Sequence, residues 1–291
     1  MQGTVDGFSY GLVTPLVAYV MACLGGALGL RCTARSLQAA GRRRAGWLAL
    51  GSAAIGSGVW TMHFVAMMGF SVVQTPVHYD ELITFASLAV GIGMVGIGIF
   101  IAGYWGASGR ALFTAGAVTG LGIASMHYLG MAGMRLNGTL EYNTLTVAAS
   151  VVIAVVAATA ALWATGQSKG LLWSIGASLV MGLAVTGMHY TGMAALDVHL
   201  HRAAGDPAGE SAAALLAPMM VGPLVFLVLA GVVVIFDPAV VTGGADRAPV
   251  DRRPGIPAHT AVAHTARRTP ARRLRRRGTA RHPGSRSPQN W

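Results

Sequence analysis

The sequence predicts an all-α membrane protein of seven transmembrane helices, arranged as three parallel two-helix repeats followed by a seventh helix. Three observations support this fold class. Of the 291 residues, 54% are hydrophobic and only 11% are charged, whereas an ordinary soluble domain carries about 25% charged residues. Seven apolar segments are each long enough to cross a bilayer, and one short motif recurs three times at nearly constant spacing. The 40 glycines agree with this, because small residues let membrane helices approach each other closely.

The seven apolar segments follow one another with polar connections between them. A helix needs about 20 apolar residues to span the hydrocarbon core, and these segments are too long, and lack the alternation, for barrel strands. In chain order the predicted helices cover residues 11–30, 46–70, 82–104, 112–134, 144–165, 171–195 and 213–236. The first ten residues contain Asp6 and no basic residue, so we expect the first segment to be a retained anchor and not a cleaved signal peptide. Cys23 lies inside the first apolar segment and Cys32 at its end; if the helix continues straight to Cys32, the nine positions between them are too many for a disulfide.

The charges between the segments predict the orientation in the membrane. Nineteen of the 21 Lys and Arg residues lie on one side, in the first, third and fifth connections and after residue 237. The other side carries only Arg135 and Arg202, against seven acidic residues. Because basic loops remain cytoplasmic, we expect the N-terminus outside and the C-terminus inside. The second, fourth and sixth helices then run outward.

A six-residue motif, Met-His-aromatic-x-small-Met, lies toward the end of each of these three helices. Its copies occupy residues 62–67, 126–131 and 188–193. Their histidines are separated by 64 and 62 positions, and a glycine stands seven positions before each of them, at Gly56, Gly120 and Gly182. The repeat unit is therefore a pair of helices used three times. All three motif helices point the same way, which places the motifs at one depth near the outer face.

The residue types of the motif favour a metal site. An ionisable side chain inside a membrane helix is costly and usually functional, and the histidine and second methionine of each motif lie one turn apart on one face. Thioether sulfur is soft and imidazole is borderline, a combination that favours copper, above all Cu(I). The predicted ligands are Met62, His63, Met67, Met126, His127, Met131, Met188, His189 and Met193. Two other interpretations remain open: methionine as an adaptable filler of apolar helices, and a hydrogen-bonded His/Tyr network without a metal.

With these motifs on alternate outward-running helices, the chain resembles the MHYT-domain family of bacterial integral-membrane sensor proteins over roughly residues 11–236. The resemblance implies a multi-pass module of the bacterial cytoplasmic membrane that binds copper and senses a diatomic gas (O2, CO or NO) or redox state. It implies a cofactor-binding role for Tyr128 and Tyr190, whereas Phe64 departs from the tyrosine pattern. Many family members join this module to cytoplasmic signalling enzymes. The residues after Phe236 are too few and too polar for such an enzyme, so we expect no enzymatic activity and a separate cytoplasmic signalling partner.

Residues 1–236 thus form the predicted sensor domain, and residues 237–291 form a predicted disordered, Arg-rich cytoplasmic tail. The tail has almost no large apolar residues with which to build a core. We expect it to contact anionic lipid, and docking to an acidic partner or to nucleic acid is the alternative. A membrane metal-handling protein or transporter is the alternative function for the whole chain. It is less favoured because transporter sites usually lie near the membrane midplane.

Overall fold

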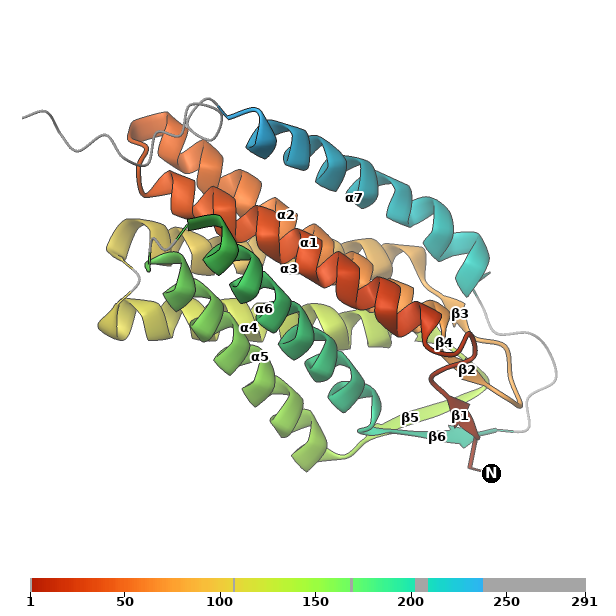
Figure 1. The fold of residues 1–291 in the computed structure, drawn as a ribbon. Helices are drawn as coiled ribbons and strands as arrows, with labels where there is room; N and C mark the ends of the chain where they lie inside the picture. Colours follow the sequence, from red (N-terminus) through yellow and green to blue (C-terminus); the bar gives the residue numbers. More distant parts are fainter. Residues whose placement is uncertain (1, 107, 168–169, 202–208, 238–291) are drawn as a thin grey trace, which may run out of the picture. The chain divides into compact units, whose positions relative to one another are not determined.

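The computed structural model describes residues 2–106, 108–167, 170–201 and 209–237, with only the backbone for residues 170–172. Its helices are α1 (Val13–Ser36), α2 (Gly41–Met68), α3 (Glu81–Trp105), α4 (Gly109–Ala132), α5 (Thr144–Thr165), α6 (Gly170–Met193) and α7 (Ala212–Ile235) (Figure 1). Helices α1 to α5 and α7 are each long and apolar enough to cross a membrane. The predicted all-α membrane fold with seven helices is therefore confirmed. Residues 238–291 of the predicted tail (residues 237–291) lie outside the described residues.

Helices α1 to α6 form a closed ring. Each packs against the next helix in the chain, and α6 packs back against α1. Helix α7 packs mainly against α2 and α1 (Figure 1). The motif helices α2, α4 and α6 therefore alternate around the ring with α1, α3 and α5.

Glycines set the close spacing within this ring. A Cβ atom added to Gly25 of α1 would lie 2.7 Å from the Cα of Gly58 in α2, so these two backbones touch. A Cβ on Gly120 of α4 would lie 2.5 Å from the Cα of Val155 in α5. Substitution at either position would push two backbones apart, which agrees with the predicted role of small residues in tight helix packing.

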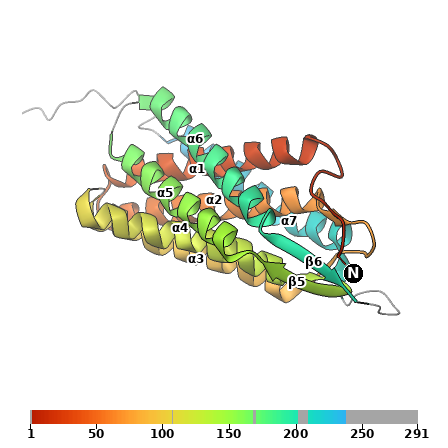
Figure 2. The same cartoon turned by 90° about the horizontal axis from the view of Figure 1, so that it is seen from below.

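Short strands gather at the end of the ring where the motif helices finish. Strand β1 (Val5–Asp6) pairs with β2 (Ser71–Val72), and β3 (His78–Tyr79) lies between β4 (Met134–Arg135) and β7 (Glu210–Ser211). The longest pair, β5 (Gly138–Tyr142) with β6 (Leu196–Leu200), joins the connections that follow α4 and α6 (Figure 2). These strands were not predicted. They tie together the connections that leave the three motif helices.

Basic residues occupy the opposite end of the ring, but partly within helices. Five arginines were predicted in the first connection and Arg110 in the third, and this was wrong. Arg31 and Arg35 lie in α1, which continues to Ser36; Arg42, Arg43 and Arg44 lie in α2, and Arg110 lies in α4. Arg35 Nε lies 2.6 Å from the carboxylate of Asp237, so an ion pair joins the end of α1 to the residues after α7. Cys23 and Cys32 are both free thiols, as predicted.

Asp80 caps the start of α3 and gives a prediction for pH dependence. Its carboxylate accepts a hydrogen bond from the backbone N–H of Ile83 at 3.1 Å and pairs with Arg135 at 3.1 Å. The hydrogen bond from Ile83, followed by that from Arg135, lowers the pKa of Asp80 below its ordinary value of 3.8. A carboxyl group with a lowered folded-state pKa stabilises the fold above that ordinary value, and this contribution is lost as the pH falls through the folded-state pKa.

We therefore expect Asp80→Ala to lower the melting temperature of the purified protein at pH 7. The difference from wild type should shrink when thermal unfolding is measured below about pH 4. The variant Asp80→Asn keeps a capping oxygen but loses the charge. Its melting temperature at pH 7 should therefore lie between those of wild type and Asp80→Ala. A difference between Asp80→Ala and wild type that stays constant from pH 7 to pH 3 would contradict the electrostatic part of this explanation.

Candidate metal centre

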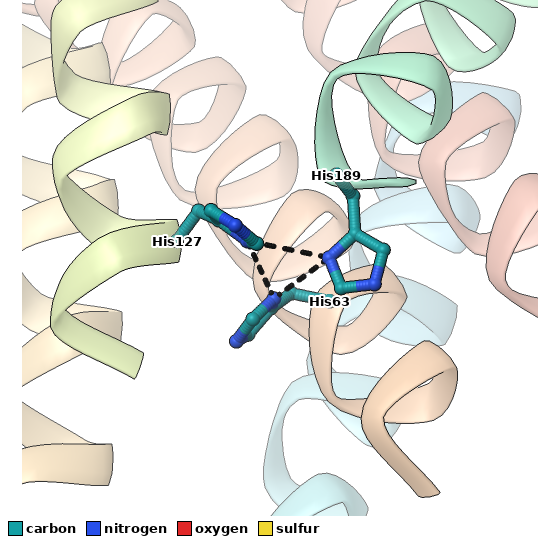
Figure 3. A group of neighbouring side chains, drawn as sticks. All are labelled: His63, His127 and His189. Carbon is teal, nitrogen blue, oxygen red and sulfur yellow. Dashed lines mark hydrogen bonds between the residues drawn. The ribbon is translucent and has the colours of Figure 1, made fainter. Parts of the chain in front are cut away.

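Three histidines from three different helices meet inside the ring. His63 lies in α2, His127 in α4 and His189 in α6, each about one turn before its helix ends. All three are 1% exposed. Their Nδ1 atoms point toward one another (Figure 3) and are separated by 3.1 Å (His63 to His189), 3.1 Å (His63 to His127) and 3.3 Å (His127 to His189). The predicted convergence of the three motifs is confirmed for the histidines.

Hydrogen bonds alone satisfy this triangle of nitrogens only in part. In a neutral imidazole each ring nitrogen either carries a hydrogen or offers a lone pair. With three mutually adjacent Nδ1 atoms, at least one pair must therefore consist of two donors or two acceptors. The Nε2 atoms of His63 and His127 are also buried and without a partner. A cation would bind all three Nδ1 lone pairs at once, so the chemistry of the donor set fits a metal ion.

The size of the triangle of Nδ1 atoms also fits a metal ion. For an equilateral triangle with the mean of the three observed sides, the centre lies about 1.8 Å from each nitrogen, against the 2.0–2.1 Å of a typical Zn–N(His) bond. A small outward shift of the rings makes up this difference. The described residues thus include one cluster that can hold a metal ion, and it consists of His63, His127 and His189.

Two glycines of the motif make room for these imidazoles. A Cβ atom on Gly130, three positions after His127, would lie 2.6 Å from Nε2 of His63. A Cβ on Gly192, three positions after His189, would lie 2.5 Å from Nε2 of His127. The small residue of one motif therefore accommodates the histidine of the preceding motif. This role was not predicted from the sequence, although the common offset of these small residues from each histidine was the available signal.

The aromatic residue after each histidine forms a wall beside it. Phe64, Tyr128 and Tyr190 each lie edge-on to the adjacent imidazole, with ring centroids 4.5, 4.8 and 5.0 Å apart. The hydroxyl of Tyr128 lies 2.6 Å from Ser150 Oγ on α5. The ring of Tyr190 stacks on Phe8 at 5.5 Å, and its buried hydroxyl has no partner. These contacts support a structural role, and cofactor binding by the two tyrosines stays a prediction.

The six predicted methionine ligands lie in the same region of the core. Met62, Met67, Met126, Met131 and Met188 are each 1% exposed, and Met193 is partly buried against the core. A Cβ atom on Gly91 of α3 would lie 3.1 Å from Cγ of Met126, so this side chain packs against the neighbouring helix. Ligation by sulfur stays a prediction.

Comparison with known proteins gives a family match. Residues 56–115 and 120–177 match the family model MHYT, described as the bacterial signalling protein N terminal repeat. The two matched segments start 64 positions apart, which equals the separation of His63 and His127. No solved structure matches the chain.

Three curated relatives are similar over about two thirds of this chain. The bifunctional diguanylate cyclase/cyclic di-GMP phosphodiesterase MucR of Pseudomonas aeruginosa is 36% identical over 197 residues, which cover 66% of this chain and 29% of the relative. The cyclic di-GMP phosphodiesterase NbdA of the same species is 34% identical, covering 67% of this chain and 26% of the relative. The signaling protein YkoW of Bacillus subtilis is 28% identical, covering 66% and 24%. The similarity thus spans less than a third of the length of each relative.

Proposed function

Because this chain belongs to the MHYT family of bacterial signalling proteins, whose module is a membrane sensory domain, we propose that it senses a diatomic gas (O2, CO or NO) or redox state through copper bound by His63, His127 and His189. The observation that carries this proposal is the buried triangle of Nδ1 atoms, in which at least one pair of nitrogens cannot form a hydrogen bond. When bound, copper would supply a redox-active centre with affinity for small diatomic ligands.

The ligand chemistry supports copper over harder cations. The cluster contains three imidazoles and no carboxylate, and imidazole suits zinc, copper, iron and nickel but not calcium or magnesium. Buried motif methionines lie on the same helices as the histidines, and a thioether ligand from one of them would select Cu(I) among these metals. The chain's own residues keep the imidazoles in place: the aromatic walls and the two motif glycines fix the rings, and their burial excludes water.

An apolar cavity beneath the triad supports a gas as the ligand. Several of its lining residues stand four or eight positions before a motif histidine: Ile55, Thr119, Ile123, Met181 and Val185. At 1.5 Å of rise per residue, they lie about 6–12 Å from the triad along the helices. The cavity measures about 10 Å³, which is about the space that a single water-sized guest needs, and its lining is apolar. Such an interior suits O2, CO or NO better than it suits an ion or a polar metabolite.

Metal analysis of the purified full chain tests the proposal. We expect one copper per chain by elemental analysis, nitrogen ligation by X-ray absorption, and a change in that spectrum when CO is added to the reduced protein. Absence of stoichiometric copper after reconstitution, or zinc bound in preference to Cu(I), would overturn the copper assignment. Copper uptake into proteoliposomes would instead indicate the metal-handling or transport alternative.

The names of two relatives support an output through cyclic di-GMP signalling. In the proposed arrangement this chain is the non-enzymatic sensory part, and a cytoplasmic signalling protein or domain receives its signal. In the predicted orientation, the basic end of the ring faces that partner.

A further inference from the structure

A second feature lies far from the triad, on the outer surface of the ring between α2 and α3. An apolar groove of about 700 Å³ runs there, within the range of roughly 300–1,000 Å³ typical of small-molecule sites. Its floor is formed by small residues, Ala49 and Ser52 of α2 with Gly93 and Gly96 of α3. A Cβ on Gly93 would meet no atom within 4 Å, so this floor is open.

Aromatic and basic residues stand at one end of the groove. Tyr104 and Trp105, which line it, are 50% and 73% exposed. The guanidinium carbon of Arg44 lies 4.8 Å from the centre of the Tyr104 ring, and this guanidinium donates a hydrogen bond to the carbonyl of Gly103. Exposed tyrosine and tryptophan near a helix end are typical of the membrane–water interface. The groove therefore starts at the interface on the basic side and runs inward.

Three consecutive arginines concentrate positive charge at this end. Arg42, Arg43 and Arg44 stand in the first turn of α2, which has no acidic residue there and no side-chain cap. The N-terminal end of a helix itself carries partial positive charge, so cations there are unfavourable unless an anion is near. Arg42 stands two turns before Ala49 and hence on the same face of the helix as the groove floor. The interfacial end of the groove thus favours an anion.

We propose that this groove binds one anionic phospholipid, with an acyl chain along the glycine floor and the phosphate at the arginines. The groove extends from Ile92 to Trp105, which corresponds to about 20 Å along the helix and is sufficient for one leaflet of a core about 30 Å thick. Each arginine near the surface strengthens binding of anionic lipid about fivefold. A glycine floor would also suit a second copy of the chain. However, a parallel pair would bring six arginines together at one depth, so charge favours the lipid.

Native mass spectrometry of the full chain in detergent tests this proposal, with dioleoyl phosphatidylglycerol and dioleoyl phosphatidylcholine as probes. We expect wild type to retain one phosphatidylglycerol in preference to phosphatidylcholine. The variant Gly93→Leu/Gly96→Leu fills the groove and should lose both lipids. The variant Arg42→Gln/Arg44→Gln should retain both lipids, with the preference for phosphatidylglycerol reduced by about 25-fold.

Matched controls separate this site from general lipid contact. Gly176→Leu adds the same side chain to an open, exposed position of α6, and Arg110→Gln removes an exposed arginine from the start of α4. Both variants should retain phosphatidylglycerol in preference to phosphatidylcholine to the same extent as wild type. Equal loss of lipid in Gly176→Leu and Gly93→Leu/Gly96→Leu would overturn the proposal, as would an unchanged lipid preference in Arg42→Gln/Arg44→Gln. A dimer that dissociates in Gly93→Leu/Gly96→Leu would also overturn it, since the groove would then hold a second copy.

Discussion

Replacing His127 with leucine is expected to abolish stoichiometric copper binding while the metal-free protein remains folded. The substitution removes one of three converging nitrogens and leaves two. Removal of a hydrogen bond that supports a metal ligand lowers the metal affinity by about 10–100-fold. Removal of a ligand itself should therefore lower the copper affinity by more than about 100-fold. Copper content and affinity are measured by elemental analysis and competition with a Cu(I) chelator.

The same variant separates a metal site from a structural histidine network. In the metal-free triad at least one pair of nitrogens is mismatched, and Nε2 of His127 has no partner. Exchange of an unsatisfied buried polar group for an apolar one of similar shape can be nearly neutral or stabilising. The melting temperature of metal-free His127→Leu should therefore match or exceed that of metal-free wild type. His199→Leu is the control, because His199 lies on strand β6 outside the triad, and it should retain copper. Copper affinity at the wild-type level in His127→Leu would rule out the triad as the site.

Gly192→Ala is expected to disturb the triad without removing any of its nitrogens. The new methyl group would lie 2.5 Å from Nε2 of His127, a ring that already contacts two other imidazoles. Overpacking of a tight core typically costs about 1–3 kcal/mol, and we expect this loss in the unfolding free energy together with weaker copper binding. Gly130→Ala should act in the same way on His63.

Gly187→Ala provides the matched control on the same helix. A Cβ there meets no atom within 4 Å, and alanine is a better helix former than glycine by about 1 kcal/mol. This variant should be as stable as wild type or slightly more stable, with unchanged copper affinity. If Gly192→Ala bound copper as tightly as Gly187→Ala, the proposed accommodation of His127 by Gly192 would be wrong.

The helices could be predicted closely because each apolar run is bounded by charged or polar residues. Predicted residues 144–165 coincide with α5, and most other boundaries differ by one to five residues. The convergence of the histidines followed from parallel motif helices and a constant spacing. The main error at helix ends arose at Arg31 and Arg35, because positive charge was taken to mark the end of α1. Arginine in fact favours helices, and its long side chain can reach the membrane interface from within a helix.

The finer features of the site could not be read from the sequence. Which imidazole nitrogen faces the centre depends on rotamers, and the accommodation of His63 by Gly130 depends on how neighbouring helices are rotated. The strands escaped prediction because most have only two residues, too few for an alternating pattern. The tyrosines were assigned by resemblance, and the contact of Tyr128 with Ser150 required knowledge of the packing of α4 on α5.

The contact between α1 and α6 has a consequence for biogenesis. The ribosome delivers α2 and α4 long before α6, which begins at Gly170. A nascent chain that has inserted five helices therefore contains His63 and His127 but not yet His189. Completion of the ring and arrival of His189 occur in the same event, so a partly inserted chain cannot acquire the full ligand set prematurely.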